Sequence, residues 1–421
     1  MSIKYKKKSL NLENGYINFK SCYMKRLSFV LGVMAYAVCL FSLVSCTNSQ
    51  EAKNVRIDML DAAENPVAVK LSEVASSVEY IPLELKDSAY LFAGMNILAT
   101  DNSYVFQSAN KSVNVAFYEF DKAGKFIRSV GSKGRAKGEF VSPKGLCYNS
   151  VAKDYALLDQ NKLIIYGPDG SFKTENTVIK FRSMGFPRIF CEDGKYIINA
   201  IVVDNLESMM KGEMKDMLIE LDSDANILRQ VEFSQTITKA QAAPGGNRGM
   251  SGNGMMLYAN DGIFRYYREN ATDTVKCLDP QTLEPNGFYL LDGYDKGVLM
   301  NKFSYMENER YIFMLIMKNK KFFPEAQEWD MKNYALYDKK EGSMKALPNN
   351  EGALLSGFEN DIDNGGIPFW PSYIKGNKMY QLIGAEDFVE LASSSGSARV
   401  KEIAAGLNAE SNPVLMVVTL K

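Results

Sequence analysis

The residues best suited to chemistry form a short acidic segment in the last part of the chain. Asp361, Asp363 and Asn364 come just before a glycine in the segment DIDNG. Hard oxygen ligands around a glycine turn suit Ca²⁺, so these three residues are candidate calcium ligands. A full EF-hand loop is absent, because the ninth and twelfth positions from Asp361 are Phe369 and Ser372. The alternative is a loop whose carboxylates cap backbone amides, with no cofactor.

The two tryptophans are candidate binding residues. Trp370 lies between Pro368 and Pro371, where it would present a stacking surface for a sugar or a peptide. The alternative is that its ring packs between strands. Trp329 ends the aromatic segment 322–329 in a long connection. Exposed aromatic side chains there would mark a contact site, unless they fold back onto the core.

The composition excludes several kinds of active site. The chain has no histidine, which removes His-based acid–base catalysis, Ser-His triads and His-ligated metals. Cys147, Cys191 and Cys277 are far apart and have no CxxC spacing. They are interpreted as buried small hydrophobic residues rather than as disulfide partners or metal ligands.

The body of the chain is mildly acidic. Residues 1–45 hold seven of the 49 basic residues and one of the 50 acidic residues, which leaves 42 basic and 49 acidic residues from Cys46 onward. The net charge of this part is −7. Because a nucleic-acid surface carries a basic patch, nucleic acid is not an expected partner.

The elements that must position these residues are β-hairpins. In residues 117–121 apolar and polar side chains alternate, which is typical of a strand. The segment Asp121–Gly124 is a turn, and Lys125–Val130 resumes as a second strand. The glycine-rich segment 131–140 that follows lacks the Lys-Ser/Thr ending of a phosphate-binding loop.

This hairpin pattern recurs along the chain. Further copies lie at residues 163–172, 218–228 and 334–342, and Gly170 follows Gly124 by 46 positions. Strand-turn-strand repeats at intervals of about 40 to 55 residues predict propeller blades. We therefore expect an all-β fold, a six-bladed β-propeller over residues 55–421. The periodicity of Gly384–Leu407 predicts one or two helices inserted before the last strand.

The segment FDKAGKFIRSVGSKGRAKGEFVSPKGL closely resembles the NHL-type propeller repeat. Residues 71–85, 267–275, 357–371 and 412–418 resemble segments of six-bladed β-propeller lipoproteins from Bacteroidota. One departure is Lys276, where that family more often has Tyr. The resemblance covers nearly all of the chain after the leader. It implies the fold and a lipoprotein character, but no activity, since the family is largely uncharacterised.

The N-terminal region resembles a lipoprotein leader. Residues 1–45 begin with an extension, and Met24 is the expected initiator. Two positive charges and the apolar run 27–44 follow Met24, as in a signal peptide. The ending LVSC resembles a bacterial lipobox, which makes Cys46 the expected lipidation site. Residues 46–54 would be the lipidated cysteine and a polar tether. The alternative is a transmembrane helix.

The leader predicts an exported protein. The tether lacks an acidic run next to Cys46, and this favours an outer-membrane lipoprotein on the periplasmic face over one on the cell surface. The lipid on Cys46 would hold the protein at the membrane.

Arg135, Lys144, Arg188 and Arg268 lie near the expected starts of blades. Propellers gather polar side chains there, so these four residues are candidates for an anion site. The alternative is that they are solvated surface charges.

Three functions remain open. The first is a membrane-anchored, non-catalytic propeller that binds a ligand or a partner at the envelope, the partner being an unknown envelope protein or glycan. The second is a Ca²⁺-dependent hydrolase or lyase acting on a sugar or lactone, for which Asp361 and Asp363 would be ligands. The third is a subunit that docks on an outer-membrane transporter. No catalytic residue can be named for any of them.

Overall fold

A computed structural model describes residues 54–86, 89–92, 96–109, 115–179, 183–203, 205, 207–208, 215–233, 255–268, 273–293, 296–301, 303–318, 331–349 and 352–421. Residues Asn54–Lys421 form one compact unit. The leader, Cys46 and the tether up to Lys53 lie outside the described residues. In the ranges given above, no helix is long and apolar enough to cross a bilayer.

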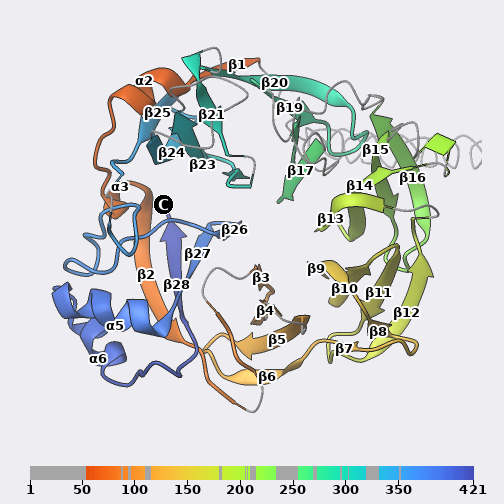
Figure 1. The fold of residues 1–421 in the computed structure, drawn as a ribbon, viewed down its shortest axis with the longest axis horizontal. Coiled ribbons are helices and arrows are strands. Elements are labelled where there is room, and N and C mark those ends of the chain that lie inside the picture. The colour runs from red at the N-terminus through yellow and green to blue at the C-terminus, as the bar shows by residue number, and fades with distance from the viewer. Residues whose placement is uncertain are drawn as a thin grey trace, which may run out of the picture. The chain divides into compact units, whose positions relative to one another are not determined.

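Six sheets follow one another around a central axis and form the predicted six-bladed β-propeller (Figure 1). Blade 1 contains β3 (Ile97–Ala99), β4 (Ser103–Ala109), β5 (Val115–Asp121) and β6 (Phe126–Ser129). Blade 2 contains β9 (Pro143–Asn149), β10 (Asp154–Asp159), β11 (Lys162–Tyr166) and β12 (Phe172–Thr177). Between them in sequence is a small parallel pair, β7 (Ser132–Lys133) and β8 (Glu139–Phe140).

The other four blades repeat this order. Blade 3 contains β13 (Ser183–Glu192), β14 (Lys195–Val202), β15 (Lys215–Leu221) and β16 (Ile227–Phe233). Blade 4 contains β17 (Met255–Asn260), β18 (Ile263–Arg268), β19 (Thr274–Leu278) and β20 (Pro285–Asp292). In blade 5, β21 (Val298–Met300) and β22 (Met306–Glu307) pair with β23 (Tyr311–Lys318), and β24 (Met331–Asp338) and β25 (Ser343–Ala346) follow. Blade 6 contains β26 (Tyr373–Lys375), β27 (Lys378–Ile383) and β28 (Val414–Leu420).

The N-terminal segment closes the ring. Strand β2 (Ala75–Pro82) pairs with β28 and becomes the outer strand of blade 6, with Val78 opposite Val418. Strand β1 (Val55–Asp58) adds in parallel to the edge of β20 in blade 4. The segment between β1 and β2 passes blade 5 (Figure 1). The N-terminal segment thus pairs with the last strand of the chain and completes the ring.

The core lies between neighbouring blades. Every residue of β10 is buried, because the middle strands of a blade have another blade on each face. One apolar cluster joins Phe106 and Phe120 of blade 1 to Tyr380 and Leu415 of blade 6. This arrangement explains why the middle strands read as continuous apolar runs, whereas the outer strand β16 alternates.

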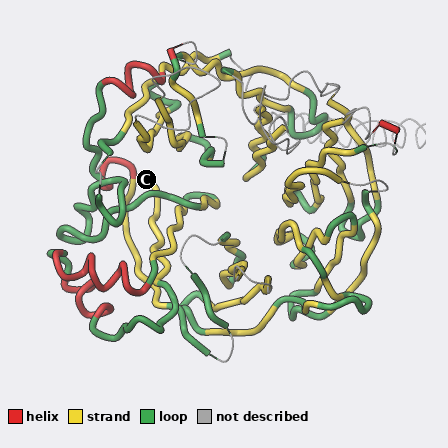
Figure 2. Tube along the Cα trace, viewed as in Figure 1, coloured by secondary structure: helices red, strands yellow, loops and turns green. Residues whose placement is uncertain are grey.

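The helical insertion lies where it was predicted, between β27 and β28. It consists of α5 (Ala385–Ser394) and α6 (Ala398–Ala404), seen as the paired helices in Figure 2. The Ser397 hydroxyl accepts the Val400 N–H and caps α6 (3.2 Å). Phe388 is buried against the Tyr80 ring, with centroids 5.8 Å apart. The insertion is therefore anchored on the ring-closing strand β2.

Two short helices were not predicted. Strand β1 ends at Asp58, whose carboxylate accepts the Asp61 N–H (3.1 Å) and caps α2 (Met59–Glu64). Helix α3 (Leu71–Val74) then leads directly into β2.

Gly124, the glycine of the blade 1 hairpin turn, cannot carry a side chain because the backbone of β2 lies too close. Gly124 has a φ of +84°, and a Cβ there would lie 2.3 Å from the Pro82 carbonyl oxygen. The turn of blade 1 therefore docks directly on the outer strand of blade 6. In the third copy of the hairpin, Ala225 takes the same left-handed conformation, with a φ of 63°.

Candidate functional site

The inner strands define two ends of the propeller axis. Each blade begins with its inner strand, which leads into a hairpin turn to the second strand. At one end, the turn face, these hairpin turns bond to one another. The bonds are Asn149 Nδ2 to the Gly194 carbonyl (2.9 Å), the Gly262 N–H to the Glu192 carboxylate (2.9 Å), and the Gly376 N–H to the Asp261 carboxylate (2.7 Å).

The turn face is tied together across the axis. Asp261 of blade 4 also pairs with Lys375 of blade 6 (2.6 Å), which bypasses blade 5. Burial raises the pKa of Glu192, opposed by its hydrogen bond from Gly262 and by Lys375. Because these polar groups already bond to one another, the turn face is the less suitable end for a ligand.

Two predicted anion-site residues lie on neighbouring inner strands, away from the hairpin turns, with Lys144 near the start of β9 and Arg188 in the middle of β13. A Cβ on Gly145 of β9 would lie 3.2 Å from Ile189 of β13, so these positions are neighbours on adjacent inner strands. The residue before each is a cation, Lys144 and Arg188. Lys144 is exposed and Arg188 is half-buried. Among the described residues neither forms an ion pair.

An exposed aromatic side chain accompanies this pair. The Arg188 guanidinium lies 6.0 Å from the ring centroid of Phe303, which is 58% exposed. Phe303 belongs to the loop between β21 and β22, and its N–H donates to Asn301 Oδ1 (2.9 Å). Arg188 also lies near Tyr267, where burial raises the tyrosine pKa to about 12 and the arginine opposes this. We call the end carrying Lys144, Arg188 and Phe303 the cation face.

A second aromatic pair lies at the same end. Tyr90 and Phe92 precede the inner strand β3 and make an edge-to-face contact with centroids 4.9 Å apart. Each is 40% exposed. The Tyr90 carbonyl accepts the hydroxyl of Ser108, near the end of β4 that is remote from the hairpin turn (2.9 Å). The cation face therefore combines cations with exposed rings.

The other predicted binding residues are dispersed. Arg135 is exposed in the β7–β8 connection, away from the inner strands (Figure 1). Arg268 ends β18 beside Met255, so its backbone lies at the cation-face end of blade 4. Trp329 lies outside the described residues. Trp370 is 5% exposed and stacks on Tyr334 with centroids 4.5 Å apart, which is the packing alternative.

The candidate calcium ligands make internal hydrogen bonds. Asp361 accepts the Ser72 N–H (2.9 Å) and hydroxyl (2.6 Å), and these bonds lower its pKa. Asp363 accepts the Tyr80 hydroxyl (2.6 Å), and Asn364 Nδ2 donates to the Gly396 carbonyl (3.1 Å). The loop thus connects α3, β2 and the helical insertion. In the described ranges no three acidic, Cys or His side chains gather as metal ligands.

The described cysteines lie in poorly reactive surroundings. Burial raises the pKa of Cys191 to about 12 and raises the pKa values of Cys147 and Cys277 as well. A thiol held protonated at neutral pH is a weak nucleophile. Cys147 and Cys277 are buried, as the sequence predicted, whereas Cys191 is half-buried.

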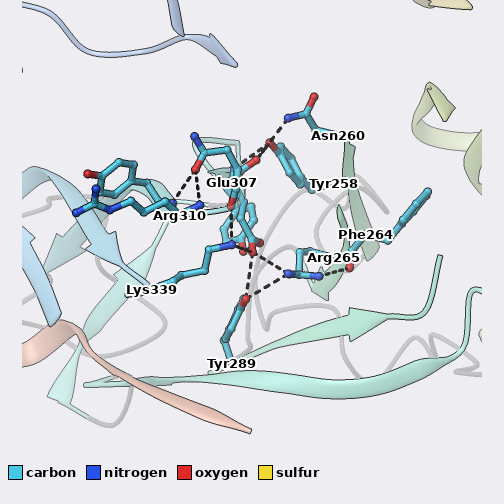
Figure 3. A network of polar contacts seen from close by, with 11 residues as sticks. Tyr258, Asn260, Phe264, Arg265, Tyr289, Glu307, Arg310 and Lys339 are labelled. Atoms are coloured by element: carbon cyan, nitrogen blue, oxygen red, sulfur yellow. Dashed lines mark hydrogen bonds and ion pairs between the residues drawn. The ribbon is translucent and has the colours of Figure 1, made fainter. Parts of the chain in front are cut away.

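A buried ionic network was missed in the sequence. Glu307 on β22 has no exposed side-chain surface and accepts from Arg265 of blade 4 (2.7 Å) and Lys339 of blade 5 (3.0 Å). The Tyr289 hydroxyl donates to the same carboxylate (3.1 Å), as does the Tyr305 hydroxyl (Figure 3). The network joins blades 4 and 5 and fixes the end of the loop that carries Phe303.

The fold has been seen in solved structures. A Bacteroides fragilis protein described as exported is 17% identical, with a TM-score of 0.60, and the match covers 88% of this chain and 100% of that chain. A member of the DUF4221 family from Bacteroides vulgatus is 9% identical with a TM-score of 0.45, and the match covers 83% of this chain and 97% of that chain. The likeness to the Bacteroides fragilis protein concerns the fold alone. No curated protein matches the chain. The family described as "Domain of unknown function (DUF4934)" matches residues 54–419, the whole propeller, and the chain belongs to that family.

Proposed function

We propose that this chain is a membrane-anchored, non-catalytic lipoprotein of the cell envelope whose cation face binds an anionic glycan. The observation that carries the proposal is the placement of Lys144 and Arg188 at equivalent positions of adjacent inner strands, with no carboxylate partner among the described residues. An arginine can hold a carboxylate or a phosphate through two parallel hydrogen bonds. A ligand with negative charges would complete this pair.

The aromatic side chains favour a sugar over a small inorganic anion. Phe303, Tyr90 and Phe92 expose ring surface at the same end of the propeller, and rings supply apolar contact area at low conformational cost. A glycan offers both the apolar faces of its rings and, where it is acidic, the charges for Lys144 and Arg188. Functional sites commonly lie on loops held by a rigid scaffold, and the turn face already uses its polar groups internally.

The membrane attachment rests on the lipobox at Cys46, with the periplasmic face of the outer membrane as the proposed location. Metabolic labelling with a palmitate analogue and membrane fractionation test it directly. Replacing Cys46 with Ser should abolish labelling. A wild-type protein that stays in the membrane fraction without being labelled would argue for a transmembrane helix instead.

Calorimetric titration tests the binding site. Short oligogalacturonates are the anionic probe, and uncharged galactose oligomers of the same length are the control. Lys144→Gln and Arg188→Gln should each weaken oligogalacturonate binding at least tenfold, whereas Arg135→Gln, at an exposed cation off the cation face, should leave it unchanged. Equal binding of both oligomers, or equal affinities in all three variants, contradicts the proposal. Competition by an acidic peptide alone would assign the face to a protein partner.

A further inference from the structure

A groove of about 460 Å³ lies on the rim where blade 6 meets blade 1. Its walls come from three segments that are far apart in the sequence. They are residues 82–85, which continue from β2, the turn 123–125 of blade 1, and residues 406–412, which lead from the helical insertion to β28. The volume lies in the range of small-ligand sites.

Buried hydrogen bonds fix the walls. Asn412 has no exposed surface, and its Nδ2 donates to the carbonyls of Glu84 (2.9 Å) and Ala89 (2.8 Å). Its Oδ1 accepts the Leu91 N–H (2.9 Å). The Glu84 N–H donates to the Gly124 carbonyl (2.8 Å), which ties the first wall to the second. The groove is therefore held in shape without a ligand.

The groove carries two opposite charges that are not paired internally. Lys125 belongs to the wall from blade 1 and Glu410 to the wall that follows the helical insertion. In the described part of the chain, each makes hydrogen bonds through its backbone, and neither side chain forms an ion pair. The third charged residue, Glu84, is already occupied, since its carboxylate accepts the Phe126 N–H (2.9 Å).

We propose that this groove binds a short free peptide. Lys125 would pair with its carboxylate and Glu410 with its terminal ammonium group. Charges of opposite sign on different walls select a ligand that carries both, whereas a simple anion would meet Glu410 and a simple cation would meet Lys125. This site contains neither Lys144 nor Arg188 and does not depend on them.

Calorimetry on the full chain tests the assignment with the dipeptide L-alanyl-L-alanine. Lys125→Gln and Glu410→Gln should each raise the Kd at least tenfold. Matched controls are Lys340→Gln, in the corresponding turn of blade 5, and Glu390→Gln, on the exposed side of α5. Neither control should change the Kd. Dipeptides with a blocked amine or a blocked carboxyl should bind at least tenfold more weakly than the free dipeptide.

Two results would overturn the proposal. One is no heat of binding for the free dipeptide with the wild-type chain. The other is a Kd that the Lys125 and Glu410 variants leave unchanged. All four exposed positions tolerate the change to Gln sterically, so a thermal melt equal to wild type verifies each variant's fold. Lys144→Gln must leave dipeptide binding intact, which separates this site from the cation face.

Discussion

Glu307→Gln is expected to destabilise the propeller strongly, although Gln differs from Glu by one atom. In the native protein the carboxylate is fully buried and accepts from Arg265 and Lys339, whose side chains are 12% and 20% exposed. The substitution removes the negative charge and leaves two cations facing each other in a low-dielectric interior. Removing one partner of a buried ion pair costs about 3–5 kcal/mol.

This free energy can be converted into a melting temperature. Unfolding entropies near 2.1 cal/mol/K per residue give about 0.8 kcal/mol/K for a unit that spans Asn54–Lys421. The loss of about 3–5 kcal/mol therefore lowers Tm by about 4–6 °C. Glu309→Gln is the matched control, because Glu309 is exposed two positions further along the chain. Its Tm should stay within about 0.5 °C of wild type.

The pH dependence provides a second readout. Burial would raise the pKa of Glu307, but Arg265 and Lys339 outweigh it and lower this pKa below its ordinary value. The native state then holds the carboxylate charged more strongly than the unfolded chain does. The stabilisation is complete above the unfolded pKa of about 4.3 and is lost as the pH falls through the lower native value. The Tm difference between wild type and Glu307→Gln should therefore shrink in acid. Equal Tm values for both Gln variants at pH 7 would refute the reasoning.

Three further predictions follow from the same structure. Gly342→Ala should lower the free energy of unfolding by the ~1–2 kcal/mol of left-handed strain, because no atom lies within 4 Å of its new Cβ. Gly124→Ala should lower it further, because its Cβ would also meet the backbone of blade 6. Urea denaturation measures both losses, and equal losses would count against the docking of the turn on blade 6. Asp361→Ala should lower the free energy of unfolding by about 1 kcal/mol, equally with and without Ca²⁺. A rise in Tm on adding Ca²⁺ that this variant abolishes would instead support Asp361 as a calcium ligand. Cys191, whose pKa partial burial raises to about 12, should resist iodoacetamide at pH 8 in the native protein and react in urea, as mass spectrometry would record; rapid native labelling would contradict the raised pKa.

Much of the fold was predictable because local signals and global topology agree. The copies of the hairpin predicted blades, and the family resemblance of residues 412–418 falls on the last strand, β28. The helical period of residues 384–407 gave the insertion. The Asp-x-x-Gly turn has a physical cause, since Asp121 Oδ1 accepts the N–H groups of Ala123 and Lys125 (both 2.9 Å) and Gly124 takes the left-handed conformation. The NHL-type assignment of the repeat stays a prediction.

The candidate site was predictable only in part, because convergence depends on contacts between blades. Lys144 and Arg188 were recognised as cations near blade starts, but their alignment follows from the packing of β9 on β13. Phe303 gives no sequence signal, since a single aromatic residue in a polar loop is equally compatible with burial. Glu307 resembles a surface residue of a short strand, and its partners come from two blades. Trp370 shows the opposite case, in which a ring between prolines packs inside.

Hydrogen exchange during ligand binding tests the central claim most directly. Saturation of the protein with oligogalacturonate should slow amide exchange around Lys144, near the start of β9, around Arg188, in the middle of β13, and in the loop around Phe303. The hairpin turns at Asp193 and Asp261 should exchange at an unchanged rate. Protection at those turns, or no protection around Lys144 and Arg188 in a protein that demonstrably binds the probe, would contradict the assignment of the cation face as the binding surface.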